Sequence, residues 1–193
     1  MKRFVPIVEG YGDVEAVPVL IGRTGAAFGL QIISEQPIRA GEWKSLRAPG
    51  KLERYLELAA SRNADAILIF LDLDDGCAVA ERDEALERIE SWRNGRPIEV
   101  GTVFAVREYE CMFLHVAELL NPEAAQVANS DQIRDAKGGV RAILGRRYKE
   151  TQDQISLTRT MPLAAVFERC RFYRKFCKEL TGLNYNEMPA IVV

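Results

Sequence analysis

A nearly continuous apolar run extends from Ala66 to Leu73 and stops abruptly at Asp72-Leu73-Asp74-Asp75-Gly76. A strand with one face in water alternates apolar and polar residues, whereas a parallel strand covered on both faces by helices is apolar almost throughout. Aspartate and glycine then favour a turn. The run therefore predicts a central strand of a parallel sheet, with helices packed on both sides.

Strand-like and helix-like segments alternate on either side of this run. Strands are expected at residues 4–9, 31–39, 66–73 and 98–106. Helices are expected at residues 14–28, 51–62, 78–92, 112–120, 131–144 and 163–180. Such alternation favours an α/β fold with a mostly parallel, doubly wound sheet of four strands flanked by helices, followed by a helical C-terminal extension.

The size of the chain favours one domain. With 193 residues, 48% of them hydrophobic, the chain can bury one core, and no linker or repeat divides it. We expect a single domain over residues 1–193, with a core at about 1–125 and a helical, basic extension at about 126–193.

The charges are unevenly distributed. Residues 1–133 hold 14 Lys and Arg against 22 Asp and Glu, whereas residues 134–178 hold 12 Lys and Arg against 4 Asp and Glu. An acidic front and a basic rear suit a metal-dependent enzyme that acts on a polyanion, because the metal requires carboxylates and the phosphates require cations. A solvated basic helix face would give the same pattern, and this alternative stays open.

Several classes of protein are disfavoured. The apolar runs are shorter than a membrane span and the N-terminus does not resemble a signal peptide, so we expect a cytoplasmic protein with no membrane partner. The four cysteines form no CxxC pair, which disfavours a zinc knuckle or a disulfide framework and favours buried free thiols. The single histidine, His115, lies in an apolar helical stretch, where a structural role is usual.

Acidic residues follow three of the expected strands. Glu9 ends the first strand, Asp72 and Asp74 end the third, and Glu108 and Glu110 follow the fourth. In a parallel sheet, sites form beyond the carboxyl ends of the strands. Carboxylates two residues apart on an extended segment point the same way, and hard cations such as Mg²⁺ prefer oxygen ligands. The pattern predicts a divalent metal site, although DLDDG could also be a simple turn.

The sequence disfavours two kinds of nucleotide site. Gly10-Tyr11-Gly12-Asp13-Val14-Glu15 resembles half of a dinucleotide fingerprint, but Glu15 replaces the third glycine and Asp13 would repel a pyrophosphate. We therefore expect no nicotinamide or flavin cofactor. No GxxxxGK[ST] motif occurs in the chain. Asp13 itself could cap the following helix or reach back to a metal.

These residues carry a family resemblance. Glu9-Gly10 followed by Asp13, and then Asp72-x-Asp74 after a buried strand, resembles the Toprim (topoisomerase-primase) domain, especially the form found in OLD-family nucleases. Over nearly the whole chain, later segments resemble a family of small stand-alone Toprim-like proteins. Those segments are Arg107-Glu108-Tyr109-Glu110, Met112-Phe113-Leu114, Lys137-Gly138-Gly139, and Leu157-Thr158 running into Met161 to Leu163.

The resemblance implies a Toprim form of the Rossmann-like sheet and a two-metal site, with Mg²⁺ or Mn²⁺, for phosphodiester chemistry. It assigns Glu9 as metal ligand or general base and Lys137 as the catalytic lysine of OLD-type nucleases. It assigns as metal ligands Asp72, Asp74, Asp13 and Glu110, with Glu108 as an additional candidate. OLD nucleases carry an ATPase in the same chain, so here an ATPase partner would act in trans, in a phage-defence or mobile-element system.

The leading expectation is therefore a metal-dependent nuclease that hydrolyses a phosphodiester, with nucleic acid as its partner. Contacts to the polyanion are expected from the basic segment, at Arg141, Arg146, Arg147 and Lys149. The main alternative is a non-catalytic regulatory or partner-binding module with a vestigial acidic site. A phosphoacceptor receiver domain and the haloacid-dehalogenase class fit less well, because both require acidic residues directly after the first strand.

Overall fold

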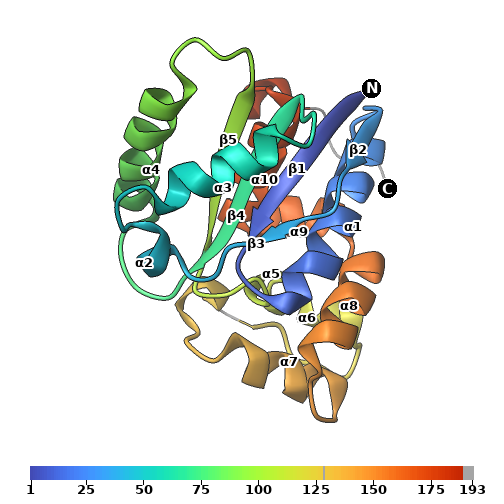
Figure 1. Cartoon of the computed structure of the whole chain (residues 1–193). Helices are drawn as coiled ribbons and strands as arrows, with labels where there is room; N and C mark the ends of the chain where they lie inside the picture. The colour runs from blue at the N-terminus through green and yellow to red at the C-terminus, as the bar shows by residue number, and fades with distance from the viewer. Residues whose placement is uncertain (128, 189–193) are drawn as a thin grey trace.

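A five-stranded sheet lies at the centre of the computed structural model, which describes residues 1–127 and 129–188 (Figure 1). The strands are β1 (Lys2–Val8), β2 (Ile32–Ser34), β3 (Ile38–Arg39), β4 (Ala66–Leu73) and β5 (Glu99–Val106). Their order is β2-β1-β4-β5, every pairing is parallel, and β3 pairs with β1. This arrangement confirms the predicted α/β fold with a mostly parallel sheet.

The apolar run is a central strand, as predicted. β4 pairs with β1 on one side and β5 on the other, and its side chains from Ala66 to Leu71 are buried. The predicted strand at residues 31–39 is instead divided into β2 and β3, which pair with successive parts of β1. Pro37 lies in the gap, and proline has no N–H to donate to a neighbouring strand.

Helices follow each long strand. The longer ones are α1 (Tyr11–Ala27), α3 (Lys51–Ala60), α4 (Ala78–Arg93), α7 (Ala136–Leu144), α9 (Leu163–Arg169) and α10 (Arg171–Thr181). The short ones are α2 (Trp43–Leu46), α5 (Cys111–Leu114), α6 (Ala117–Leu120), α8 (Ile155–Thr160), and the single turns η1 (Ser130–Gln132), η2 (Glu150–Gln154) and η3 (Tyr185–Glu187). In the described parts of the chain no helix is both long and apolar enough to cross a bilayer.

Three helical predictions differ from the structure. The segment 112–120 divides into α5 and α6, the segment 131–144 is helical mainly from Ala136, and the segment 163–180 divides into α9 and α10 at Cys170. The region 150–160 was not predicted to be helical and forms η2 and α8. Periodicity marks apolar faces but does not show where a chain must bend to pack on a sheet.

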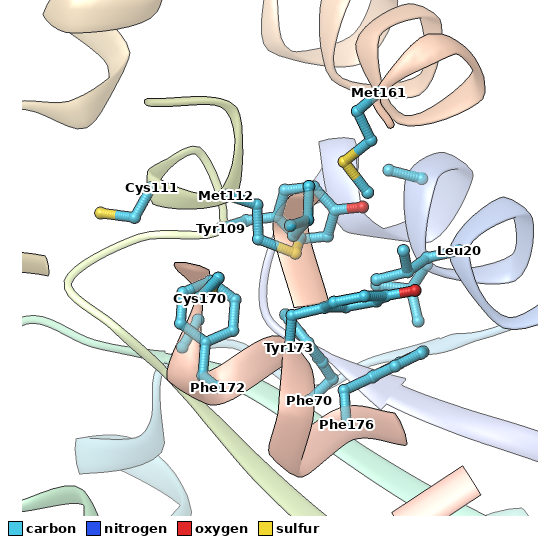
Figure 2. Close-up of a cluster of buried hydrophobic side chains, with 14 of the residues drawn as sticks. Leu20, Phe70, Tyr109, Cys111, Met112, Met161, Cys170, Phe172, Tyr173 and Phe176 are labelled. Atoms are coloured by element: carbon cyan, nitrogen blue, oxygen red, sulfur yellow. The ribbon is translucent and has the colours of Figure 1, made fainter. Parts of the chain in front are cut away.

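Each face of the sheet has its own core. α3 and α4 cover one face, where Leu52 and Ile89 pack with Ile7 and Ile69. α1 and the C-terminal helices cover the other face. Figure 2 shows this second core, in which the ring of Phe70 on β4 packs against Tyr109, Phe172 and Phe176, and Tyr173 stacks on Phe176. The basic C-terminal segment therefore packs its apolar side chains directly on the sheet.

The cysteines are free, as predicted, and three of them are buried. Cys111 and Cys170 lie in the core drawn in Figure 2, and Cys177 belongs to the same cluster. Burial raises the pKa of the Cys111 thiol to about 12. Cys77 differs because it is exposed at the start of α4.

Candidate metal centre

The carboxyl ends of β1, β4 and β5 lie side by side, because the three strands are parallel neighbours. Glu9 follows β1, and Asp72 and Asp74 lie at the end of β4. These three carboxylates line one cavity of about 360 Å³. The other residues lining this acidic cavity are Glu42, Trp43, Lys44, Arg47, Leu73, Asp75 and Glu81. Glu9, Asp72 and Asp74, which the sequence predicts as metal-site residues from two separate segments, therefore line the same cavity.

Asp13 lies in the first turn of α1 and is buried. One carboxylate oxygen accepts a hydrogen bond from the Gly10 N–H at 2.8 Å, and the other accepts from Nε2 of Gln154 at 2.7 Å. The first bond satisfies a free backbone donor at the helix start, so the capping role is present. The metal-ligand role of Asp13 stays a prediction.

The loop after β5 is tied to the loop after β4. Arg107 has φ +72°, a left-handed conformation that is uncommon for a residue with a Cβ. Its guanidinium donates to the backbone oxygen of Asp74 and, at 2.8 Å, to Oδ1 of Asp75. The sharp turn at Arg107 thus holds the two acidic loops together.

Tyr109 anchors this loop in the core. Its ring packs on Phe70 and Phe113, and its hydroxyl lies 2.9 Å from Oγ1 of Thr158. At the same residue the backbone N–H donates to Oδ1 of Asp72 at 3.0 Å. A buried aromatic side chain therefore fixes both the position of Asp72 and the direction of the segment that carries Glu108 and Glu110.

Glu108 and Glu110 have different surroundings. Oε2 of Glu108 accepts hydrogen bonds from the backbone N–H groups of Ala136 and Lys137, at 3.0 and 3.2 Å, so Glu108 caps the start of α7. Glu110 is 1% exposed, and its carboxylate accepts a hydrogen bond from the Tyr148 hydroxyl at 2.8 Å. The charge of Glu108 is therefore stabilised by two backbone donors, whereas that of Glu110 is stabilised by one hydroxyl donor.

The carboxylates at the carboxyl ends of β1, β4 and β5 are close enough to raise each other's pKa. Burial, reinforced by Asp13 and Asp74, raises the pKa of Glu9 to about 7. Burial also raises the pKa of Glu110 to about 7 and raises the pKa of Asp13. The pKa of Asp72 rises through burial and through the charges of Asp13, Glu110 and Glu9. Such mutual repulsion is relieved by protons or by a cation.

Lys137 lies among these acids rather than on an open helix surface. Its ammonium is 3.1 Å from Oε2 of Glu150 and 3.9 Å from Oε1 of Glu108. Burial lowers the pKa of Lys137, but the charges of Glu110, Glu150 and Glu108 together outweigh burial and raise it. The ammonium also lowers the pKa values of Asp13 and Asp72, which places one positive charge beside the acid cluster.

The four predicted nucleic-acid contacts have different environments. Arg141 and Arg147 are exposed and, with Lys137, line a cavity of about 320 Å³. Arg146 instead forms an ion pair with Asp153 at 2.6 Å, which lowers the pKa of Asp153. Lys149 is exposed, and its backbone N–H also bonds to Asp153. Arg141 and Arg147 are therefore the best placed of the four to meet a polyanion.

His115, which the sequence predicts to be structural, is half-buried, and its Nε2 lies 2.8 Å from Oδ1 of Asp131.

The turn η2 brings residues to the site that sequence reasoning missed. Glu150 accepts from the Gly12 N–H at 3.4 Å and pairs with Lys137, while Gln154 donates to Asp13. A Cβ at Gly12 would lie 1.9 Å from Oε1 of Gln154, so only glycine permits this close approach. One signal was available, because Glu150 is among the few acids of the basic segment.

The donor set fits a hard divalent cation by its chemistry, since it consists of carboxylate oxygens with unfavourable mutual repulsion. Within residues 1–127 and 129–188, however, no three His, Cys, Asp or Glu side chains already converge in an arrangement that could hold a metal ion. Several carboxylates instead bond to their own chain, as Asp13 does with Gln154. Glu9, Asp72 and Asp74 line the acidic cavity, whereas Asp13 and Glu110 do not, so ligation by all five would require side-chain rotations.

Comparisons with known proteins do not add to this geometry. The chain matches no protein-family model, no curated protein and no solved structure.

Proposed function

We propose that this protein is a metal-dependent phosphodiesterase that acts on nucleic acid with Mg²⁺ or Mn²⁺. The observation that carries the proposal is that Glu9, Asp72 and Asp74, from the ends of two neighbouring strands, line one cavity in which carboxylates repel each other. A bound divalent cation would supply charge neutralisation for the phosphate and for the leaving oxygen. The resemblance to Toprim domains of OLD nucleases agrees with this proposal.

The residues around the cavity have distinct roles in the proposed reaction. Asp72 and Asp74 would hold the cation, and Asp13 and Glu110 would be further ligands. Glu9 would accept a proton from the attacking water, because burial and the charges of Asp13 and Asp74 raise its pKa and so increase its basicity. Lys137 stabilises the negative charge that develops on the scissile phosphate.

The substrate class follows from the cations near the acids. Lys137 lies close to Glu108, Glu110 and Glu150 and also lines the cavity that contains Arg141 and Arg147. A polyanion in that cavity could therefore contact Lys137 and the two arginines together. Phosphate contacts of this type position a backbone without reading its sequence. We include in the proposal a cytoplasmic location and an ATPase partner in trans, by analogy with OLD nucleases.

The decisive experiment compares plasmid nicking by the wild type, Asp72→Asn and Asp74→Asn in Mn²⁺. Both variants should lose at least a hundredfold in rate, because each removes a ligand charge while keeping the shape of the side chain. Asp83→Asn, on the exposed surface of α4, is the matched control and should keep full activity. Unchanged nicking by both cavity variants would exclude the mechanism.

A second candidate function is a non-catalytic partner-binding module. This function is favoured because Asp13 and Lys137 already have partners within the chain. Gln154 of η2 donates a hydrogen bond to Asp13, and Lys137 donates one to Glu150 of η2. Calorimetry separates the two proposals. A nuclease requires Mg²⁺ or Mn²⁺ binding that is lost in Asp72→Asn, whereas the module predicts no heat that depends on Asp72.

A further inference from the structure

A cavity of about 550 Å³ lies at the β5 edge of the sheet, apart from the acidic cavity. α4 forms one wall and α10 the other, with Thr102, Phe104 and Val106 of β5 between them. The other residues lining this edge cavity are Cys77, Ala78, Val79, Arg82, Asp131, Arg171, Phe172, Lys175, Lys178 and Tyr185. Cys77 and Ala78 directly follow the DLDDG loop, whose Asp72, Asp74 and Asp75 line the acidic cavity.

Positive charge is concentrated in the edge cavity. Arg82 comes from α4, and Arg171, Lys175 and Lys178 come from α10, against one lining carboxylate, Asp131, which already bonds to His115. Burial lowers the pKa of Lys175 to about 8, and the charges of Arg82 and Lys178 add to the effect. Glu179 forms an ion pair with Lys175 and offsets part of this repulsion.

Two buried polar atoms at the edge cavity have no partner within the described residues. Thr102 is 1% exposed, and its hydroxyl makes no hydrogen bond. Nε of Arg82 is buried and likewise makes none. Buried polar groups are nearly always satisfied in folded proteins, so two free ones on the lining of one cavity point to a ligand with polar atoms.

The remaining lining of the edge cavity is apolar or aromatic. Val79 is 64% exposed and Tyr185 is 47% exposed, both unusually open for their residue types. Phe104 and Phe172 form part of the inner lining. An exposed tyrosine ring beside a group of cations suits a ligand that combines an anion with a flat ring, since bases stack on aromatic side chains while cations hold the phosphate.

We propose that the edge cavity binds a nucleotide unit, with its phosphate among Arg171, Lys175 and Lys178 and its base against Val79 and Tyr185. The volume lies within the usual range for small-molecule sites. A free mononucleotide and one unit of a single-stranded polynucleotide present the same chemistry. This proposal does not depend on the metal centre, because none of its groups is a carboxylate of the acidic cavity.

The test measures binding of dTMP by calorimetry and of a fluorescent (dT)15 oligonucleotide by anisotropy, both in EDTA. Val79→Glu places a negative charge on an exposed position of the rim, and the double variant Arg171→Gln with Lys178→Gln removes two cations. Each should weaken binding at least tenfold. Arg159→Gln, an exposed cation of α8 outside the cavity, is the matched control and should bind as the wild type does.

Binding of both dTMP and (dT)15 supports a site that accepts free mononucleotides and units of a single strand. Binding of dTMP alone identifies a mononucleotide site, and binding of (dT)15 alone identifies a single-strand site. Inorganic phosphate that binds as tightly as dTMP would overturn the role of the base. Failure of both ligands to bind, or binding that all variants retain, would overturn the whole proposal. Asp72→Asn should bind both ligands normally, so that loss of nicking and loss of nucleotide binding are distinguished.

Discussion

The acidic cavity and the edge cavity differ in charge and in what positions them. Carboxylates crowd the first, where the pKa of Glu9 rises to about 7, and cations crowd the second, where the pKa of Lys175 falls to about 8. Strand ends and the buried Tyr109 fix the acidic cavity, whereas surface side chains of α4 and α10 form much of the edge cavity. Each keeps like charges close together, and a ligand of opposite charge would relieve the repulsion.

The largest effect is expected when the anchor of the acidic cavity is removed. Tyr109→Ala should lower the free energy of unfolding by about 3–5 kcal/mol, because it empties a fully buried aromatic position. Urea denaturation measures the change. Tyr109→Phe, which loses only the hydroxyl contact with Thr158, should cost about 1 kcal/mol. Equal losses in the two variants would contradict an anchoring role for the ring.

Metal ions should stabilise the protein through the acidic cavity. At a hundred times the dissociation constant a ligand adds about 2.7 kcal/mol, which corresponds to about 5–10 °C in melting temperature for a chain of this size. Thermal denaturation with and without Mn²⁺ measures the shift. Asp72→Asn should abolish it, and Val79→Glu, in the edge cavity, should leave it intact. A shift that persists in Asp72→Asn would place the metal elsewhere.

Stability of the metal-free protein should fall as the pH rises. The folded protein binds a proton at Glu110 up to a pKa of about 7, while the unfolded chain releases it near 4.5. Between these values the folded state holds more protons, so Glu110 alone should cost about 2 kcal/mol between pH 5 and pH 8, and Glu9, whose pKa is also raised to about 7, should add to the loss. Denaturation in EDTA at several pH values measures this, and Glu110→Gln should reduce the slope while leaving the part that Glu9 contributes. An unchanged slope in that variant would contradict the assignment.

The smallest effect on stability is expected at the basic surface beside Lys137. Arg141→Gln should change the free energy of unfolding by less than about 0.5 kcal/mol, because Arg141 is exposed. It should nevertheless weaken DNA binding and reduce the slope of log affinity against log salt by about 1. Anisotropy titrations at several salt concentrations measure this slope. A slope equal to that of the wild type would exclude Arg141 as a phosphate contact.

The local sequence predicted the parts of the fold that depend on short-range pattern. The apolar run 66–73 is β4, and the expected helix at 78–92 matches α4 to within one residue. The division of the predicted strand 31–39 at Pro37, and of the helix 163–180 at Cys170, was missed. Pro37 is a local signal for the first break, because proline has no N–H to donate to a neighbouring strand. The break at Cys170 depends on how the helix must bend to cover the sheet, which periodicity does not encode.

The carboxylates that share one end of the sheet can be identified from the sequence, because parallel strands bring their carboxyl ends together and Glu9, Asp72 and Asp74 lie there. Their partners from distant segments are known only from the folded arrangement. Glu150 and Gln154 reach α1 across more than a hundred residues through the close approach at Gly12, and α10 brings three cations to the edge of β5. Such contacts depend on how helices and strands pack together, and no local sequence pattern specifies that packing.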